Sequence, residues 1–240
     1  MAAAIAISCR GQTAAFEVAT VKVGAPIKGD TYNINTGRIV NGVVTLGNAT
    51  LSDCLKFAYS LSTDDQLAGP DWIKSKEFRY DVTGKGIPGA TDDQLLAMLQ
   101  SLLAERFQMT LHREQREFQH YELVVGKNGP KMKESTVGPA EARGTARLDG
   151  VTTNRMQMNK LAMLLSRMAR IPVIDKTGLT GFYQFDLRYA DEVSRVPPEN
   201  PAGPSIFTAV QEQLGLKLES RKGPVEVLVV DRAQQIPVEN

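Results

Sequence analysis

Two histidines and two glutamates stand close together in one charged stretch of the chain, and they are the residues best suited to chemistry. The stretch, HREQREFQH, runs from His112 to His120 and includes Glu114 and Glu117. Two imidazoles and a carboxylate can hold a zinc ion, and a metal-bound water can hydrolyse an ester or a lactone. The spacing does not match the H-E-x-x-H zinc motif, and histidines in a charged strand are usually solvated. A solvated surface is therefore the first interpretation, and a catalytic metal site is the alternative.

Other sequence patterns that could carry chemistry are weak. Asp175, Asp186 and Asp191 could offer oxygen ligands to calcium, but they do not form a D-x-D-x-D-G loop. The sequence contains neither a G-x-S-x-G nucleophile elbow nor a G-x-x-x-x-G-K-S/T phosphate loop, and Gly84-Lys85-Gly86 is interpreted as a plain loop. We therefore expect no metal and no cofactor, with calcium or zinc as the alternative.

Four residues are candidates for contacting a partner. Trp72, the only tryptophan, follows a Gly-Pro turn, so it is either an exposed anchor for a ligand or a part of the core. Arg113, Arg116 and Arg221 are expected at hairpin turns, where they either face a carboxylate-bearing partner or are simply solvated. The residue types alone do not choose between these roles.

Composition excludes some classes of partner. Of the 240 residues, 42% are hydrophobic and 23% are charged, which is an ordinary globular mixture. The 28 basic and 27 acidic residues leave a net charge of +1, so no global field attracts nucleic acid or an anionic membrane. Neither Cys9 nor Cys54 has a Cys or His neighbour at metal-ligand spacing. Nucleic acid is not an expected partner, whereas the ligand and the oligomeric state are left open.

The first fifteen residues suggest where the protein acts. Residues 2–8 form an apolar run that is too short to span a bilayer and lacks the basic start of a secretory signal. The run is either the remnant of a signal peptide or lipoprotein signal, or an irregular cytoplasmic N-terminus. Because the mature-looking sequence begins only at Phe16, the first option is favoured, and we expect a periplasmic or secreted protein with residues 1–15 outside the fold.

The two halves of the chain carry the same order of patterns, the second about 107 positions after the first. Apolar residues meet apolar residues at this offset, as in the pairs Leu51 and Met158, Cys54 and Leu161, Ala58 and Leu165, Phe107 and Leu214, and Met109 and Leu216. We therefore predict two tandem related modules, residues 16–125 and 150–232. A polar linker, residues 126–149, joins them, and a frayed tail, residues 233–240, follows.

Each module is expected to pack two amphipathic helices on a short, mainly antiparallel sheet, which makes the fold α+β. In the first module Thr50 and Thr91 are the predicted N-caps of the two helices. Asn41-Gly42 predicts a tight turn between two strands. The strand at residues 108–113 is expected to turn back into an antiparallel strand at residues 119–125, which would bring the two histidines towards each other.

Several stretches resemble those of a known family, the soil-associated proteins abundant in Acidobacteria. These proteins carry a domain of unknown function that is sometimes appended to sensor-type membrane metallopeptidases. The stretches are FEVATVK (16–22), GPDWI (69–73), LLAERFQMTLHRE (102–114), YELVV (121–125), DKTGLTGFYQFDL (175–187) and LGLKLESRKGPVEVLVVD (214–231). The resemblance implies an exported protein and no established activity.

Each half also resembles the short N-terminal module of secretins and TonB-dependent receptors. The likeness is one of spacing, and it is carried by Thr177-Gly178-Leu179 and Leu214-Gly215-Leu216. The first half has Gln108-Met109 in place of the second Gly-Leu pair. This resemblance implies docking to other proteins by strand addition or sheet-face contacts, without catalytic residues.

These observations lead to two hypotheses about function. The first is an exported, non-enzymatic binding module with its interaction surface in the groove between the two copies. The alternative is a secreted hydrolase of a small ester or lactone that uses His112, His120 and the neighbouring carboxylates. A detached sensor domain of a membrane peptidase is a third option that follows only from the resemblance. Whether the protein is an enzyme is left open.

Overall fold

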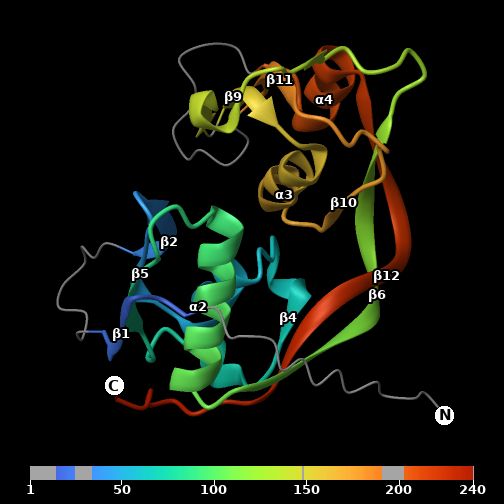
Figure 1. Cartoon of the computed structure of the whole chain (residues 1–240). Coiled ribbons are helices and arrows are strands. Elements are labelled where there is room, and N and C mark those ends of the chain that lie inside the picture. The colour runs from blue at the N-terminus through green and yellow to red at the C-terminus, as the bar shows by residue number, and fades with distance from the viewer. Residues whose placement is uncertain (1–14, 25–33, 148, 191–202, 240) are drawn as a thin grey trace. The chain divides into compact units, whose positions relative to one another are not determined.

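The computed structural model describes residues 15–24, 34–147, 149–190 and 203–239. The chain divides into two compact units: unit 1 lies within residues 1–114 and 227–240, and unit 2 comprises residues 115–226. Both units combine helices with mainly antiparallel strand pairs (Figure 1), so the predicted α+β class holds at this level. None of the described helices is long and apolar enough to cross a membrane.

Unit 1 is built on an antiparallel sheet of order β1-β5-β3-β2. Its strands are β1 (Val18–Val23), β2 (Asn35–Val40), β3 (Val43–Ala49) and β5 (Tyr80–Lys85). Asn41 and Gly42 both have positive φ between β2 and β3, which confirms the predicted turn because such a turn needs left-handed backbone at both central positions.

Two helices, α1 (Leu51–Ala58) and α2 (Asp92–Arg106), close the core of unit 1. Phe107 ends α2 and is fully buried, with its ring edge-on to Tyr80 at a centroid distance of 4.8 Å. Cys54 is also fully buried, which raises the pKa of its thiol far above the usual range and makes it an inert apolar side chain. The 3-10 turns η1 (Asp64–Gln66) and η2 (Asp71–Lys74) and the short strand β4 (Leu67–Ala68) lie between α1 and β5.

The start of α2 agrees with the predicted N-cap at Thr91, and the contribution of this cap to stability can be measured. The Thr91 hydroxyl accepts a hydrogen bond from the Gln94 amide, and the Gln94 side chain accepts one from the Thr91 amide. Because this capping box satisfies two backbone donors, Thr91→Ala should lower the free energy of unfolding by about 1 kcal/mol. Urea denaturation measures the change. Thr136→Ala, at an exposed position outside any helix, is the control, and an equal effect in both variants would contradict the capping role.

Unit 2 contains a second four-stranded sheet, of order β7-β11-β9-β8. Its strands are β7 (Lys133–Glu134), β8 (Gly144–Arg147), β9 (Gly150–Met156) and β11 (Tyr183–Arg188). Helices α3 (Met158–Ala169) and α4 (Ile206–Leu214) pack on one face, since buried residues of both helices share a core with Val151 and Leu187. A 3-10 turn, η3 (Pro139–Glu141), precedes β8. The other face of this sheet carries the candidate site.

Two long strands continue from one unit into the other. They are β6 (Thr110–Val125) and β12 (Leu216–Arg232), neighbours in a sheet of order β10-β6-β12-β4 (Figure 1). Strand β10 (Val173–Asp175) pairs parallel to β6, and β4 pairs parallel to β12. The predicted hairpin within residues 108–125 is therefore wrong. Residues 113–119 contain no Gly, Pro or Asn that would favour a turn, and the charged side chains simply project from one extended strand.

The compact units divide the chain differently from the predicted modules. The end of β6 supplies Leu123 to the core of unit 2, and the end of β12 supplies Leu228 and Val230 to the core of unit 1. Residues 126–149, predicted as a linker, contribute β7, η3 and β8 to unit 2. The segment predicted as a frayed tail is held to unit 1, where the Gln234 amide donates to the Phe107 carbonyl and the Tyr80 hydroxyl to the Gln235 carbonyl.

Candidate functional site

His112 lies on β6 in unit 1 and forms an exposed ion-pair cluster. Its Nδ1 is 2.9 Å from the Asp231 carboxylate, and its Nε2 is 3.7 Å from Glu114 Oε2. The hydrogen bond to Asp231 is the main cause of a raised His112 pKa, and the negative charges of Asp231 and Glu114 add to it. The arrangement stabilises a protonated imidazole, which is the opposite of what a metal ligand needs.

A titration tests this cluster. The pKa of His112 should lie above the ordinary value of 6.5 in the folded protein. Since folding raises the pKa, the stabilisation is fully present below the unfolded value and is lost as the pH rises through the folded value. NMR of the His112 ring against pH measures it, and Asp231→Asn should return the midpoint towards 6.5. Identical midpoints in the two proteins would contradict the pairing.

His120 lies further along the same strand, in unit 2, and its surroundings differ. It is buried, with Nδ1 3.2 Å from the Phe118 carbonyl. Eight residues of extended chain separate His120 from His112, which corresponds to about 26 Å along the strand. The two rings are therefore too far apart for one ion, and Glu117 projects from the strand between them at an exposed position. Among the described residues no group of three or more His, Cys, Asp and Glu side chains is arranged to hold a metal ion; Cys9 and Asp191 lie outside those residues.

The four predicted binding residues are spread over separate environments. Trp72 is half-buried in η2 and packs on the core of unit 1, with its ring edge-on to Phe78 at 6.0 Å. Arg113 lies over the Tyr59 ring at 6.0 Å. Arg221 pairs with Glu219 at 2.7 Å and with Glu122 at 3.6 Å, and Arg116 is exposed on β6. The three arginines lie on long strands instead of at hairpin turns.

The loop predicted at Gly84-Lys85-Gly86 belongs to a longer glycine pattern. Residues 84–89, GKGIPG, have the G-x-G-x-x-G spacing of dinucleotide-binding loops; they begin in the last two residues of β5 and precede α2. However, β5 pairs only antiparallel, and the capping box together with Asp92 and Asp93 occupies the start of α2. A Cβ on Gly86 would come within 2.2 Å of the Leu95 side chain. Close packing accounts for Gly84 and Gly86, and a positive φ of 81° accounts for Gly89. The described residues of this loop therefore do not have the setting of a phosphate site.

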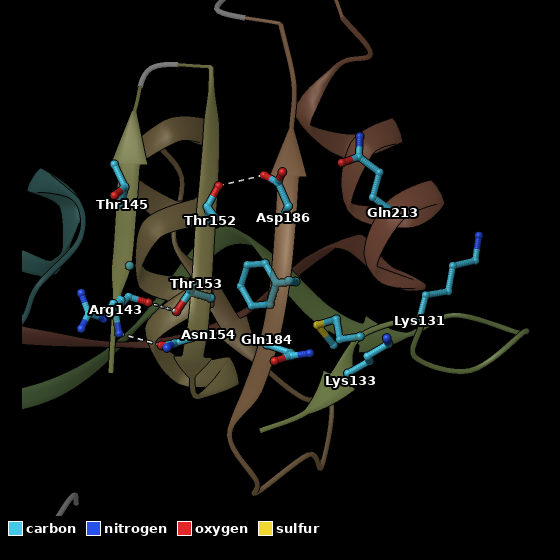
Figure 2. Close-up of a pocket in the computed structure, with 13 residues that line it drawn as sticks. Lys131, Lys133, Arg143, Thr145, Thr152, Thr153, Asn154, Gln184, Asp186 and Gln213 are labelled. Atoms are coloured by element: carbon cyan, nitrogen blue, oxygen red, sulfur yellow. Dashed lines mark hydrogen bonds between the residues drawn. The ribbon is translucent and has the colours of Figure 1, made fainter. Parts of the chain in front are cut away.

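A cleft that no sequence pattern predicted lies on the outer face of the sheet β7-β11-β9-β8 (Figure 2). We call it the sheet-face cleft. It has a volume of about 630 Å³ and is lined by residues of all four strands together with Lys131 and Gln213. Volumes of this order are typical of small-molecule sites. All of the lining residues belong to unit 2.

The side chains in the cleft form two rows across the strands. In the first row Thr145 is opposite Thr152, and Thr152 is opposite Asp186. Since Val151 and Leu187 next to them are buried, strand alternation places Thr152 and Asp186 on the outer face. The second row, two residues along, contains Arg143, Asn154, Gln184 and Lys133, as Figure 2 shows. Two cations therefore flank two amides.

Hydrogen bonds hold the two ends of the second row in place. The Asn154 side chain accepts from the Arg143 amide at 2.6 Å and donates to the Glu141 carbonyl at 3.0 Å. On the other side, the Ser135 hydroxyl donates to the Asn154 carbonyl, and its amide donates to the Phe182 carbonyl. Asn154 is thus a positioning residue for Arg143, and the Ser135 bonds fix the chain that follows Lys133.

Asp186 is the one carboxylate among the described residues that line the cleft, and it is kept ionised. Thr152 Oγ1 and Arg188 Nε each donate to Asp186 Oδ1 at 2.9 Å. The hydrogen bond from Thr152 and then that from Arg188 lower the Asp186 pKa below its usual range. At neutral pH the cleft therefore presents a fixed hydrogen-bond acceptor beside two hydroxyl groups.

Comparison with known proteins identifies the family to which the chain belongs. A family model described as "Protein of unknown function (DUF3738)" matches residues 52–233, which is most of the chain. The chain belongs to the DUF3738 family. No curated protein and no solved structure shows a significant match.

The DUF3738 match covers all the residues that line the sheet-face cleft and leaves β1, β2 and β3 outside. It supports the predicted kinship with a domain of unknown function. The soil-bacterial origin and the likeness to secretin and TonB modules stay predictions. One sequence signal could have indicated the cleft: YQFDLR, residues 183–188, alternates apolar residues with polar ones around Leu187, and the polar residues take the outward positions.

Proposed function

We propose that this DUF3738 protein is an exported, non-enzymatic binding protein, built of two related α+β modules, that holds its ligand in the sheet-face cleft. The observation that carries the proposal is the pair of polar rows on the outer face of a sheet whose inner face packs on α3 and α4. A rigid sheet presents these side chains at fixed spacings, so little conformational entropy is lost when a ligand binds.

The relation between the modules rests on element order and on one backbone detail. Each half runs strand, helix, strand, strand, helix, strand: β3-α1-β4-β5-α2-β6 and then β9-α3-β10-β11-α4-β12. Gln108 and Gly215 follow the second helix of each half, and both have positive φ, 48° and 69°. A left-handed residue at the same place in both halves is what a duplicated module would retain.

Binding is favoured over hydrolysis by the chemistry of the cleft. The hydrolase alternative needs His112 and His120 to converge, and they lie on one extended strand. Among the described residues that line the cleft there is no histidine to activate the Thr145 or Thr152 hydroxyl. The lining can bind and orient a polar molecule, but it offers no nucleophile with its base.

An NMR screen tests the binding site. The labelled protein is titrated with a panel of neutral, acidic and basic saccharides and peptides. A ligand should shift the amides of β9 and β11, and His112→Ala should leave its affinity unchanged. Ligands that shift only residues around Trp72 or His112, or products of hydrolysis in the sample, would contradict the proposal.

Export is supported by the apolar run near the N-terminus and by the resemblance to exported proteins. Fusion of the chain to an alkaline phosphatase that is active only outside the cytoplasm tests it in a Gram-negative host. Phosphatase activity is expected with residues 1–15 present and not when they are deleted. Equal activity of the two fusions would remove the assigned role of this segment.

A further inference from the structure

We infer that the ligand of the sheet-face cleft is an acidic oligosaccharide of the uronic-acid type, with carboxylates for the two cations and hydroxyls for the row that contains Asp186. The inference rests on the proposed function, because it names the ligand class of the same cleft. Two properties of the lining carry it: the position of the cations and the composition of the hydroxyl-binding row.

The cations stand at the two ends of one row. Arg143 precedes β8 and Lys133 is on β7, which are the outer strands of the sheet. At the usual strand separation, four adjacent strands span about 14 Å. Within the described residues neither side chain forms an ion pair, and both are exposed. Two unpaired cations at this separation suit a ligand whose negative charges are spread along its length.

The first row is suited to hydroxyl groups. Thr145 can donate and accept, Thr152 already donates its one hydrogen to Asp186 and can only accept a further bond, and the ionised Asp186 only accepts. This row lies about 7 Å from the cations, two residues along each strand. An acidic peptide has few hydroxyl donors for Asp186 and would place carboxylates beside it. A ligand with hydroxyls and carboxylates on each unit satisfies both rows.

The cleft offers little apolar surface. Phe185 is part of the lining, but strand alternation places its side chain on the same face as Leu187, where it packs against the core of unit 2. A simple inorganic anion could contact only one end of the row of cations and would leave the row that contains Asp186 unused.

The experiment compares matched probes on the full chain by calorimetry and NMR. Tetramers of galacturonate, mannuronate and guluronate are tested beside neutral tetramers of galactose and mannose and a glutamate tetrapeptide. At least one uronate tetramer should bind, shift the amides of β9 and β11, and weaken as salt is raised. Arg143→Gln and Lys133→Gln should each weaken its binding by about tenfold, because each removes a hydrogen bond to a charged group.

A matched variant separates these effects from a general change of charge. Arg167→Gln removes an exposed cation of α3, on the other side of the sheet, and should leave uronate binding unchanged. Neutral tetramers that bind as tightly as uronates in the cleft would overturn the inference and leave the proposed function standing. Tighter binding of the glutamate peptide would assign the cleft to peptides instead. If none of the probes shifts the amide signals of the cleft, the inference fails. The NMR screen with saccharides and peptides then tests the proposed function separately.

Discussion

Replacement of Leu123 by alanine is expected to destabilise unit 2 by about 2–5 kcal/mol and to leave unit 1 folded. Leu123 is fully buried and belongs to the core that includes Val151, Leu161 and Leu187. It nevertheless comes from the first half of the sequence, at the far end of β6. The variant therefore distinguishes two divisions of the chain. In one, the end of β6 belongs to the core of unit 2; in the other, each half of the sequence forms its own core.

Leu228→Ala is the matched variant for Leu123→Ala. Leu228 is 3% exposed and lies near the end of β12 in the second half of the sequence, yet it belongs to the core of unit 1. Amide hydrogen exchange measures each unit separately. Leu123→Ala should reduce protection in α3 and α4, and Leu228→Ala should reduce it in α1 and α2. The reverse pattern, or equal losses in both units, would contradict the division of the chain.

Gly215→Ala is expected to cost about 2–4 kcal/mol, which is more than most single substitutions by alanine. Gly215 ends α4 with φ 69°, a conformation that any residue with a Cβ adopts at a cost. A Cβ at this position would also lie 2.3 Å from the Gly129 carbonyl oxygen and 2.9 Å from the Lys131 amide nitrogen. Both neighbours are backbone atoms, so neither can swing aside as a flexible side chain could.

Gly178→Ala provides the control, because Gly178 has nearly the same φ, 70°, and no atom within 4 Å of an added Cβ. It should cost only the conformational penalty, about 1–2 kcal/mol. Urea denaturation of both variants gives the difference. Gly215→Ala should also weaken binding in the cleft, since the Lys131 amide donates to the Leu214 carbonyl just before Lys133. Equal destabilisation by the two substitutions would show that the close approach is unimportant.

The helices could be predicted because the signals that define them are local. Thr50 and Thr91 cap α1 and α2 as their sequence context indicates, and the apolar residues at three- and four-residue spacing are buried. The tight turn at Asn41-Gly42 is local in the same sense, since it depends on the left-handed preference of two adjacent residues.

The candidate site could not be predicted in this way. The segment with His112 and His120 was expected to form a hairpin. It is one extended strand instead, because its charged side chains stay hydrated when both faces of the strand are exposed to water over this stretch. The sheet-face cleft brings together Lys133, Arg143, Thr152 and Asp186 from four separate segments. The segment that carries two of these residues has few apolar residues, so periodicity alone indicated a linker.

The sequence by itself determined the helices, the first tight turn and the apolar positions that recur in both halves, because spacing and capping act over a few residues. The tertiary structure decided where β6 and β12 end and which core each end enters. It also decided that residues 126–149 add two strands to the sheet of unit 2 and so form the cleft. Strand pairing depends on backbone hydrogen bonds between distant segments, and those bonds are available to almost any residue type.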